Sequence, residues 1–432
     1  MSSVMGTQPS SVSESRVQEA VGSPARILYV EQNIDGTVGG SYRSLLFLLR
    51  GLDRRAYQPI VAFYRENELL GAYKDAGVET MVLAYPRFFD LMTPLAERGV
   101  LGRLLKPFAK VVQKALNLTM YTVMVLRHAS LLIVKRIDIL HLNNGVTVGH
   151  DFLIPAKLLR LPSIIHQRGI TPVPRWCSWL ARRADHVICV SEAARENLLE
   201  HGLWPDRTTA IHNGMDPDAL RRQIKRDVAT VRASLGIRPE ELIVGLAGMI
   251  RVWKGQMVLV KAMSLLHKTH PHIRAVIMGG IADQHQADVA YLSEIREYLQ
   301  THGLDQSVLL LDYQSNAPEY LQIFDIMVHT AIDPEPFSRV VIEGMALGRP
   351  IVASATGGTP EAIDHGVSGL LVPANDPEAL ASQIALLADR PDMRNTLGRG
   401  AVEKLERRFH IRSHVARTEA IYAGLLGDKQ PS

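Results

Sequence analysis

The chain has 432 residues, of which 47% are hydrophobic and 21% are charged. This apolar fraction excludes an intrinsically disordered chain, and the length predicts two or three domains, each with a core of its own. The 48 Lys and Arg residues exceed the 44 Asp and Glu residues by only four, which does not indicate nucleic acid as a partner, and two cysteines exclude a disulfide framework and a Cys-based zinc site.

Residues 1–25 are rich in Ser and Val and lack the basic start and apolar block of a secretory signal, so we expect a disordered leader and a cytoplasmic protein. The most apolar later stretch, 115–134, is interrupted by polar residues, which argues against a membrane-spanning helix. The interrupting residues are Asn117, Arg127, His128 and Ser130.

From residue 26 onwards, short β-branched runs alternate with longer amphipathic stretches, a pattern typical of βα units around parallel sheets. The first series of expected strands covers 26–31, 59–64, 79–84, 138–142, 163–167 and 186–190. The second series covers 242–247, 274–278, 307–312, 324–329, 350–353 and 369–373. Each series can form its own doubly wound sheet.

We therefore expect an α/β fold of two facing Rossmann-like doubly wound domains with a cleft between them. The N-terminal domain would cover 26–212, a linker 213–225 and the C-terminal domain 226–405, followed by a helix and tail over 406–432. Because ligands bind outside the carboxyl ends of parallel strands, two such sheets suit a reaction with two substrates.

The first expected strand leads into a loop with glycines at positions 36, 39 and 40, and a helix is expected to begin near Ser41. Gly39 and Gly40 allow backbone N–H groups to approach a ligand, and the helix N-terminus favours an anion. The spacing does not match the dinucleotide pattern G-x-G-x-x-G, and a simple tight turn is the alternative interpretation.

A basic insert is expected at 86–136. Residues 81–136 hold nine basic and two acidic side chains, a net charge of +7, so the rest of the chain sums to −3. From Phe108 onwards apolar residues recur at helical spacing beside a stripe of three lysines, and Pro107 is expected at the start of this helix. The helix either lies on an anionic membrane surface or is a core helix with solvated lysines. The three lysines are Lys106, Lys110 and Lys114.

In the second series, Arg251 and Lys254 follow the first strand, in a loop before a helix expected to begin near Gln256. Two cations beside a helix N-terminus can neutralise a diphosphate without a metal ion. The alternative is a solvated pair of basic side chains.

Further along, Glu335 and Glu343 flank the start of a short apolar helix expected from Arg339 to Leu347. If Glu335 precedes this helix and Glu343 lies two turns along it, both carboxylates and the free N–H groups near Ser338 can contact one ligand. Carboxylates pair with vicinal hydroxyls, and N–H groups pair with a phosphate. The alternative for Glu343 is an exposed helix carboxylate.

Taken in order, these segments resemble the retaining, nucleotide-sugar-dependent glycosyltransferases of the GT-B type, family 4. The segments are the glycine loop, VSEAARENLL with AIHNGMD, GLAGMIRVWKG, and EPFSRVVIEGMALGRPIVASATGGTPEAIDHGVSGLLVP. The resemblance covers about 26–405 and is densest between 242 and 380. It also implies that a helix near 404–426 crosses back to the first domain.

The resemblance implies roles for individual residues. Arg251 and Lys254 would hold the donor diphosphate, Glu343 the ribose hydroxyls and Glu335 the donor sugar. Backbone N–H groups of Phe337, Ser338, Arg339 and Val340 would reach the phosphate or the sugar. Gly39 and Gly40 would lie near the donor phosphate and the acceptor, and His166 near the sugar. Arg339 stands where the family commonly has a small residue, which leaves open whether its side chain touches substrate.

The implied reaction is transfer of a sugar from a nucleoside diphosphate sugar to an acceptor hydroxyl with retained configuration, with no cofactor and no metal ion. We find no carboxylate that clearly acts as a nucleophile, which favours front-face attack over two displacements. If the insert binds membrane, the acceptor would be a lipid-linked saccharide of bacterial surface polysaccharide or lipopolysaccharide assembly, and the protein would lie on the inner face of the plasma membrane.

Other interpretations stay open. One is a glycosyltransferase with a small soluble acceptor. Within the same fold, a nucleotide-sugar epimerase or a phosphorylase is also conceivable, although the glutamate pair with its upstream cations favours transfer. A non-catalytic, nucleotide-binding membrane adaptor is a further alternative, which would not need Glu335.

Overall fold

The computed structural model describes the two halves of the chain with a few short gaps. The described residues are 23–32, 39–83, 88–91, 93, 99–281 and 286–427, with the side chains of 99–104 left out. The predicted leader therefore lies outside the described residues, apart from 23–25. Gly36 and parts of the predicted insert, namely 86–87, 92 and 94–98, lie outside them as well.

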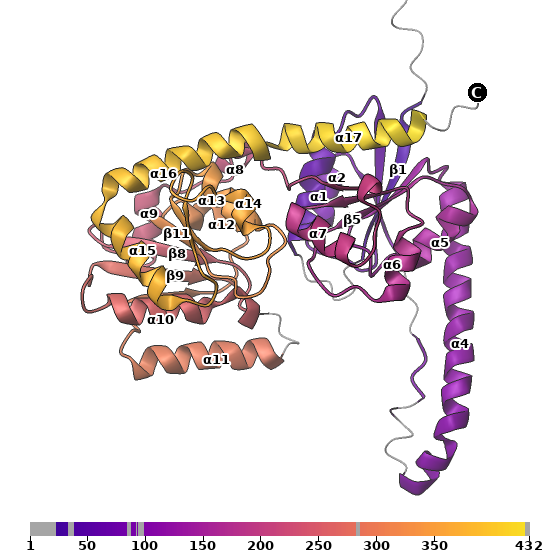
Figure 1. Cartoon of the computed structure of the whole chain (residues 1–432), viewed down its shortest axis with the longest axis horizontal. Helices are drawn as coiled ribbons and strands as arrows, with labels where there is room; N and C mark the ends of the chain where they lie inside the picture. The colour runs from indigo at the N-terminus through magenta and orange to yellow at the C-terminus, as the bar shows by residue number, and fades with distance from the viewer. Residues whose placement is uncertain are drawn as a thin grey trace, which may run out of the picture.

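Within the described residues, two parallel β-sheets lie side by side, each covered by helices (Figure 1). The strand order is β3-β2-β1-β4-β5-β6-β7 in the first sheet and β10-β9-β8-β11-β12-β13 in the second. Both contain the 3-2-1-4-5-6 order of a Rossmann-like fold, which confirms the expected fold class. In each sheet the order reverses beside the first strand of the series, between β1 and β4 and between β8 and β11, and this is where such sheets bind ligands.

All twelve predicted strands are confirmed to within about three residues. Their near-continuous apolar runs are typical of strands that are covered on both faces, and the central strand β1 is 0–1% exposed over residues 27–30. The strands are β1 (Ala25–Glu31), β2 (Tyr57–Phe63), β3 (Glu79–Val82), β4 (Ile139–Leu142), β5 (Ser163–Gln167), β6 (His186–Cys189), β7 (Thr208–Ala210), β8 (Leu242–Ala247), β9 (Ile273–Met278), β10 (Val308–Leu311), β11 (Ile326–His329), β12 (Ile351–Ser354) and β13 (Leu370–Val372). Strand β7 was not predicted, because a three-residue edge strand rich in Thr has no apolar run.

Helices follow most strands and cover both faces of the sheets. They are α1 (Gly40–Gly51), α2 (Leu70–Asp75), α4 (Gly99–Val134), α5 (His150–Leu158), α6 (Arg175–Ala181), α7 (Glu192–Glu200), α8 (Pro217–Arg221), α9 (Val228–Ser234), α10 (Gln256–Leu266), α11 (Gln286–Thr301), α12 (Ala317–Leu321), α13 (Arg339–Ala346), α14 (Thr359–Ala362), α15 (Pro377–Asp389), α16 (Pro391–Lys404) and α17 (Ile411–Gly427). The segment predicted as a linker contains α8, whose Leu220 packs in a core cluster of the second sheet.

Helix α17 connects the two halves (Figure 1). It follows α16 of the second half and runs along the first, where its Val415 and Tyr422 join the core around β1 and α1. The hydroxyl of Tyr422 lies 2.9 Å from that of Tyr29 and 2.8 Å from Nδ1 of His141. Helix α17 is thus part of the first domain's core.

Helix α4 extends away from the first domain, with its N-terminal end far from both sheets (Figure 1). Its C-terminal part is anchored by Met124, His128 and Leu132, which are buried and spaced four residues apart. Over Leu105–Val134 it is long and apolar enough, by length and composition, to cross a membrane, and only 17% of its most apolar stretch is buried.

We predicted that Pro107 begins this helix, but it lies inside the helix. A proline inside a helix removes one backbone hydrogen bond and crowds the carbonyl one turn earlier. The side chains of 105–108 are all exposed, so water can reach this part of the helix and bind the carbonyl that loses its partner.

Candidate functional site

Lys254, Glu335 and His329 meet at the point where the second sheet reverses its strand order, and we refer to them as the lysine–glutamate cluster. A short 3₁₀ turn after β8 places Lys254 directly before α10, which begins at Gln256 as predicted, and β11 ends at His329. Lys254 Nζ donates a hydrogen bond of 2.5 Å to Oε2 of Glu335, and Nε2 of His329 lies 3.3 Å from the same oxygen. The sequence did not reveal His329, although a polar residue at the carboxyl end of a strand next to the reversal point was a usable signal.

The Glu335 carboxyl group is held in its charged form. Its burial alone would raise its pKa, but the charge of Lys254 and the hydrogen bond from His329 outweigh burial and lower the pKa to about 2. The site therefore presents a fixed carboxylate beside a cation throughout the neutral range.

This low pKa predicts a specific loss of stability in acid. Because the pKa is depressed in the folded protein, the contribution of Glu335 is complete above the ordinary value of 4.5 and is lost as the pH falls toward 2. A shift of this size corresponds to roughly 3 kcal/mol. Urea unfolding at pH 6 and pH 3 should show a smaller loss of stability on acidification for Glu335→Gln than for the wild type. Equal losses in the two proteins would contradict the low pKa.

Two glycines from the segment after β12 fix the backbone of Glu335. The N–H of Gly358 donates to the Glu335 carbonyl at 2.8 Å. Gly357 has φ of +58°, and a Cβ at this position would lie 2.2 Å from the same carbonyl oxygen. Only glycine fits this close approach, which explains one glycine of the TGGTPE segment.

Arg251 lies three residues before Lys254 but turns toward α11. Its Nε lies 3.5 Å from Oδ2 of Asp288, and the side chain is partly exposed. A guanidinium on this side of the loop remains available to an anion that binds before α10.

The side chain of Arg339 connects the two domains. It is the first residue of α13, and Nη2 donates a 2.8 Å hydrogen bond to Oε1 of Glu343 one turn later. Its guanidinium also lies 3.4 Å from Ser44 Oγ and 4.9 Å from the Phe47 ring centre, both on α1. A Cβ on Gly40 would lie 3.2 Å from Cδ of Arg339. Arg339 thus brings α13 against the start of α1.

In this arrangement the two predicted glutamates bind different cations, Glu335 binding Lys254 and Glu343 binding Arg339. Ser338 precedes α13 and is buried, as is Phe337, whose ring packs 4.9 Å from His212 and belongs to the core. Val340 is partly buried in the first turn of α13. Gly39 directly precedes α1, in an extended conformation.

His166 is the penultimate residue of β5 and lies in a buried cluster of histidines. The side chain is 0% exposed, and Nδ1 lies 3.3 Å from His141 Nε2 and 3.4 Å from Nη2 of Arg168. Burial and the nearby charge of Arg168 hold the pKa of His166 well below its usual range, so the ring is neutral. Among the described residues, no group forms a hydrogen bond with the other ring nitrogen, Nε2. His166 thus lies beside His141 and Arg168, and its hydrogen-bond contacts do not include the lysine–glutamate cluster.

Arg168 and Glu31 lie at the reversal point of the first sheet and were missed by the sequence analysis. Arg168 Nη2 donates to Oδ1 of Asn143 at 2.7 Å, and Nη1 donates to Oδ1 of Asn213 at 3.0 Å. Burial lowers the pKa of Arg168 to about 10, so the side chain stays charged at neutral pH. The sequence contained a signal for this site, because these polar residues lie at or just after the carboxyl ends of strands, where such sheets bind ligands.

Glu31 is fully buried at the end of β1 and accepts hydrogen bonds from three side chains. The donors are Ser41 at 2.8 Å, Asn144 at 2.5 Å and Asn143. Burial raises the pKa of Glu31 above its ordinary value, although these hydrogen bonds oppose the shift. Glu31 thereby ties the first turn of α1 to the loop after β4.

Further contacts join the carboxyl ends of the two sheets. The Arg43 guanidinium donates to the Tyr313 hydroxyl at 2.9 Å, and this hydroxyl lies 3.1 Å from a carboxylate oxygen of Glu68. His212 Nε2 lies 2.7 Å from Glu361, whose carboxylate also accepts two backbone N–H groups at the start of α7. Among the described residues, no group of three or more His, Cys, Asp or Glu side chains is placed to hold a metal ion.

Comparison with known protein families gives two matches that follow one another along the chain. A family model described as glycosyltransferase family 4 matches residues 38–219, and one described as glycosyl transferases group 1 matches 227–404. Together they cover both sheets except β1.

Similar proteins carry related descriptions. A D-inositol 3-phosphate glycosyltransferase of Saccharomonospora viridis is 29% identical over 250 residues, 55% of this chain and 56% of the relative. The chain thus spans little more than half the length of such curated relatives. Among solved structures, Anabaena HepE in complex with UDP has a TM-score of 0.72 at 22% identity, covering 92% of this chain and all of HepE. A Rickettsia africae glycosyltransferase has a TM-score of 0.77 at 18% identity, covering 94% of this chain and all of that protein.

Proposed function

Because the chain belongs to the family 4, group 1 glycosyltransferases, we propose that it transfers a sugar from a nucleoside diphosphate sugar to an acceptor hydroxyl with retention of anomeric configuration. The observation that carries this proposal is the lysine–glutamate cluster at the reversal point of the second sheet. A buried carboxylate there can bind sugar hydroxyls, while the adjacent ammonium group can bind the departing diphosphate.

The donor would bind mainly to the second domain. Arg251 and Lys254 neutralise the diphosphate beside the N-terminus of α10, and the backbone N–H groups of 337–340 before α13 bind a phosphate or sugar oxygen. Glu335 binds the donor sugar. Glu343 binds the ribose hydroxyls. When the donor binds, Arg339 would release Glu343 and contact the donor instead.

The first domain would complete the donor site. Gly39 and Gly40 bring the start of α1 close to the phosphate, and Arg168 adds a cation at the end of β5. Neutral His166 accepts from Arg168 at Nδ1, so its Nε2, which makes no hydrogen bond to the described residues, carries the proton and can donate to a sugar oxygen.

The demanding step is departure of the diphosphate while positive charge grows on the sugar. Arg251, Lys254 and the α13 N-terminus would stabilise the leaving group, so the scheme needs no metal ion or other cofactor. In front-face attack the departing phosphate oxygen takes the proton of the acceptor hydroxyl, which explains why no nucleophilic carboxylate is required. Contacts such as Arg43 with Tyr313 hold the two domains together and would help exclude water from the donor.

For the acceptor we propose a lipid-linked saccharide of bacterial surface polysaccharide or lipopolysaccharide assembly. The protein would be cytoplasmic and would bind the inner face of the plasma membrane through 86–136. The support is α4, which carries exposed apolar side chains together with the exposed Lys106, Lys110 and Lys114. A small soluble acceptor is the second candidate, and the names of the curated relatives favour it.

A panel of UDP-, GDP- and ADP-sugars tests the reaction class. We expect one donor to be consumed, with slow hydrolysis in the absence of an acceptor and release of the nucleoside diphosphate. The anomeric configuration of the product, read by NMR, should match that of the donor. Binding of a nucleotide without turnover of any donor would favour the non-catalytic adaptor and contradict the proposal.

A further inference from the structure

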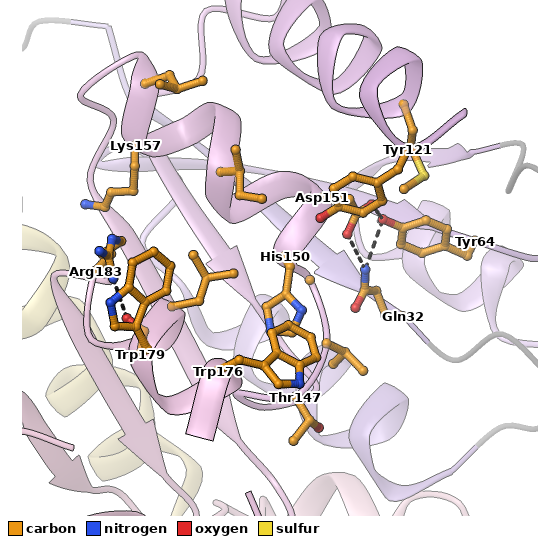
Figure 2. Close-up of a pocket in the computed structure, with 16 residues that line it drawn as sticks. Gln32, Tyr64, Tyr121, Thr147, His150, Asp151, Lys157, Trp176, Trp179 and Arg183 are labelled. Atoms are coloured by element: carbon orange, nitrogen blue, oxygen red, sulfur yellow. Dashed lines mark hydrogen bonds between the residues drawn. The ribbon is translucent and has the colours of Figure 1, made fainter. Parts of the chain in front are cut away.

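A cavity of about 780 Å³ lies in the first domain where α4 meets α5 and α6. The loop after β4 and Gln32 after β1 close one end of the cavity, at the carboxyl ends of these strands. Figure 2 shows two chemically different sides, with Gln32, Tyr64 and Asp151 on one and Lys157, Trp179 and Arg183 on the other.

The polar side is built around Asp151, in the first turn of α5. Its Oδ1 accepts a 2.9 Å hydrogen bond from Nε2 of Gln32, and its Oδ2 accepts one from the Tyr64 hydroxyl and lies 3.2 Å from Nδ1 of His128. Burial alone would raise the pKa of Asp151, but His128 and Tyr64 outweigh it and lower the pKa. The cavity therefore ends at an ionised carboxylate with an amide and a phenol beside it, a set suited to sugar hydroxyls.

This polar side is directly connected to the donor side. The backbone N–H of Gln32 donates to Asn144 at 2.6 Å, and Asn144 donates to Glu31 at 2.5 Å. Glu31 in turn holds Ser41 in the first turn of α1. A sugar hydroxyl bound by Gln32 or Asp151 would thus be connected, through Asn144 and Glu31, to the start of α1 beside the proposed phosphate site.

The opposite side is aromatic and opens to solvent. Trp176 and Trp179 are 60% and 58% exposed although both line the cavity, and Leu158 is 77% exposed. The Arg183 guanidinium lies 3.3 Å from the Trp179 ring centre, where it offers further donors to an anion.

Helix α4 lines the polar side of the cavity, where Figure 2 shows Tyr121 beside Asp151 and Tyr64. Tyr121 and Met124 of α4 line the cavity, and further along the same helix Leu118 and Val111 are 65% and 67% exposed. Exposed indole rings and exposed apolar side chains are both typical of sites at a membrane interface.

We propose that this cavity is the acceptor site and that it takes an amphiphilic acceptor, a saccharide joined through a phosphate to an apolar chain. The saccharide would bind Gln32 and Asp151, the phosphate would bind Arg183, and the chain would leave past Trp176 and Trp179 at the open, aromatic side. This inference rests on the proposed transferase function and adds the place and the orientation of the acceptor.

Quenching of tryptophan fluorescence by a brominated dodecyl maltoside, below its critical micelle concentration, tests the site on the full chain. The chain has four tryptophans, and two of them line the cavity. Trp204 provides a matched control, because it is 50% exposed and carries Arg182 over its ring, as Trp179 carries Arg183, but does not line the cavity. We expect Trp179→Ala to weaken binding at least tenfold and Trp204→Ala to leave it unchanged.

Competition experiments define the ligand class. Unbrominated dodecyl maltoside should displace the probe and maltose should not; equal displacement by maltose would indicate a site for a soluble saccharide and overturn the proposal. Arg183→Gln should weaken dodecyl phosphate at least fivefold more than dodecyl maltoside. Equal loss of probe binding in the Trp179 and Trp204 variants would show that the probe adsorbs outside the cavity, which also overturns it.

Donor hydrolysis without an acceptor separates this proposal from the proposed function. Trp179→Ala should hydrolyse the donor at the wild-type rate, whereas Glu335→Gln should lose hydrolysis and keep probe binding. If the wild type hydrolyses no donor but binds the probe as expected, the transferase proposal fails and the cavity remains an amphiphile site.

Discussion

Replacing Lys254 or Glu335 by alanine should each lower the rate of sugar transfer by about 10²–10³-fold, the usual effect of removing one group that stabilises charge in a transition state. The Lys254 variant would lack the contact with the leaving diphosphate, and the Glu335 variant would lack the contact with the donor sugar. Steady-state rates with saturating donor, measured on protein that retains its circular dichroism spectrum, test this. Near-normal rates in both variants would contradict the proposed roles.

The same pair also stabilises the fold, so stability must be separated from catalysis. The side chains of Lys254 and Glu335 are 19% and 10% exposed, and removing one charge leaves the other buried without its partner. Each single variant should therefore lose stability. The double variant Lys254→Met with Glu335→Gln removes both charges and should recover much of that stability while remaining inactive. A double variant that recovers activity as well would show that the pair acts on folding alone.

Gly255→Ala should destabilise the protein by at least about 3 kcal/mol and abolish transfer, because strain and overlap act together. Gly255 lies between Lys254 and α10 with φ of +67°, and a Cβ there would lie 2.1 Å from the carbonyl oxygen of Thr330. The hydroxyl of Thr330 donates to the Lys254 carbonyl at 3.0 Å, so any shift of this strand end moves the lysine–glutamate cluster.

Gly236 provides the matched control for this substitution. Its φ of +62° is nearly the same, but no atom lies within 4 Å of a Cβ built there. Gly236→Ala should therefore cost only the roughly 1–2 kcal/mol of a left-handed backbone and leave activity intact. Urea unfolding of both variants measures the difference. Equal losses of stability would show that the overlap between the new Cβ at position 255 and the Thr330 carbonyl oxygen is relieved without a cost in stability.

The sheet architecture could be predicted from the sequence because buried parallel strands are marked by short, continuous apolar runs. The positions of Lys254 and of α13 could be predicted in the same way, because each follows a strand that an apolar run marks and a short turn that leads into a helix. By contrast, the contacts of Arg339 with Ser44 and Phe47 cross to the other domain, and Arg168 binds Asn143 and Asn213 from distant loops. Pairings over such sequence distances leave no local pattern.

Helix α4 shows a different limit of prediction. The proline rule placed Pro107 at the beginning of a helix, yet the helix runs through it. Helical periodicity indicated an apolar face and a lysine stripe, but it contains no information on whether that face meets a core. The structure shows that most of α4 contacts neither sheet, with Phe108 72% exposed.

The path of α17 has a consequence for how the protein is made. Tyr422 and Val415 complete a core whose other members, such as Tyr29 and Leu45, are translated almost 400 residues earlier. During synthesis the first domain can form its sheet early, but this core stays open until the final helix leaves the ribosome. The second domain, whose strands are translated before that helix, can close first. We therefore expect chaperones to bind the exposed core of the nascent first domain. Shortening the chain within α17 would destabilise the first domain, although that domain is encoded at the other end of the gene.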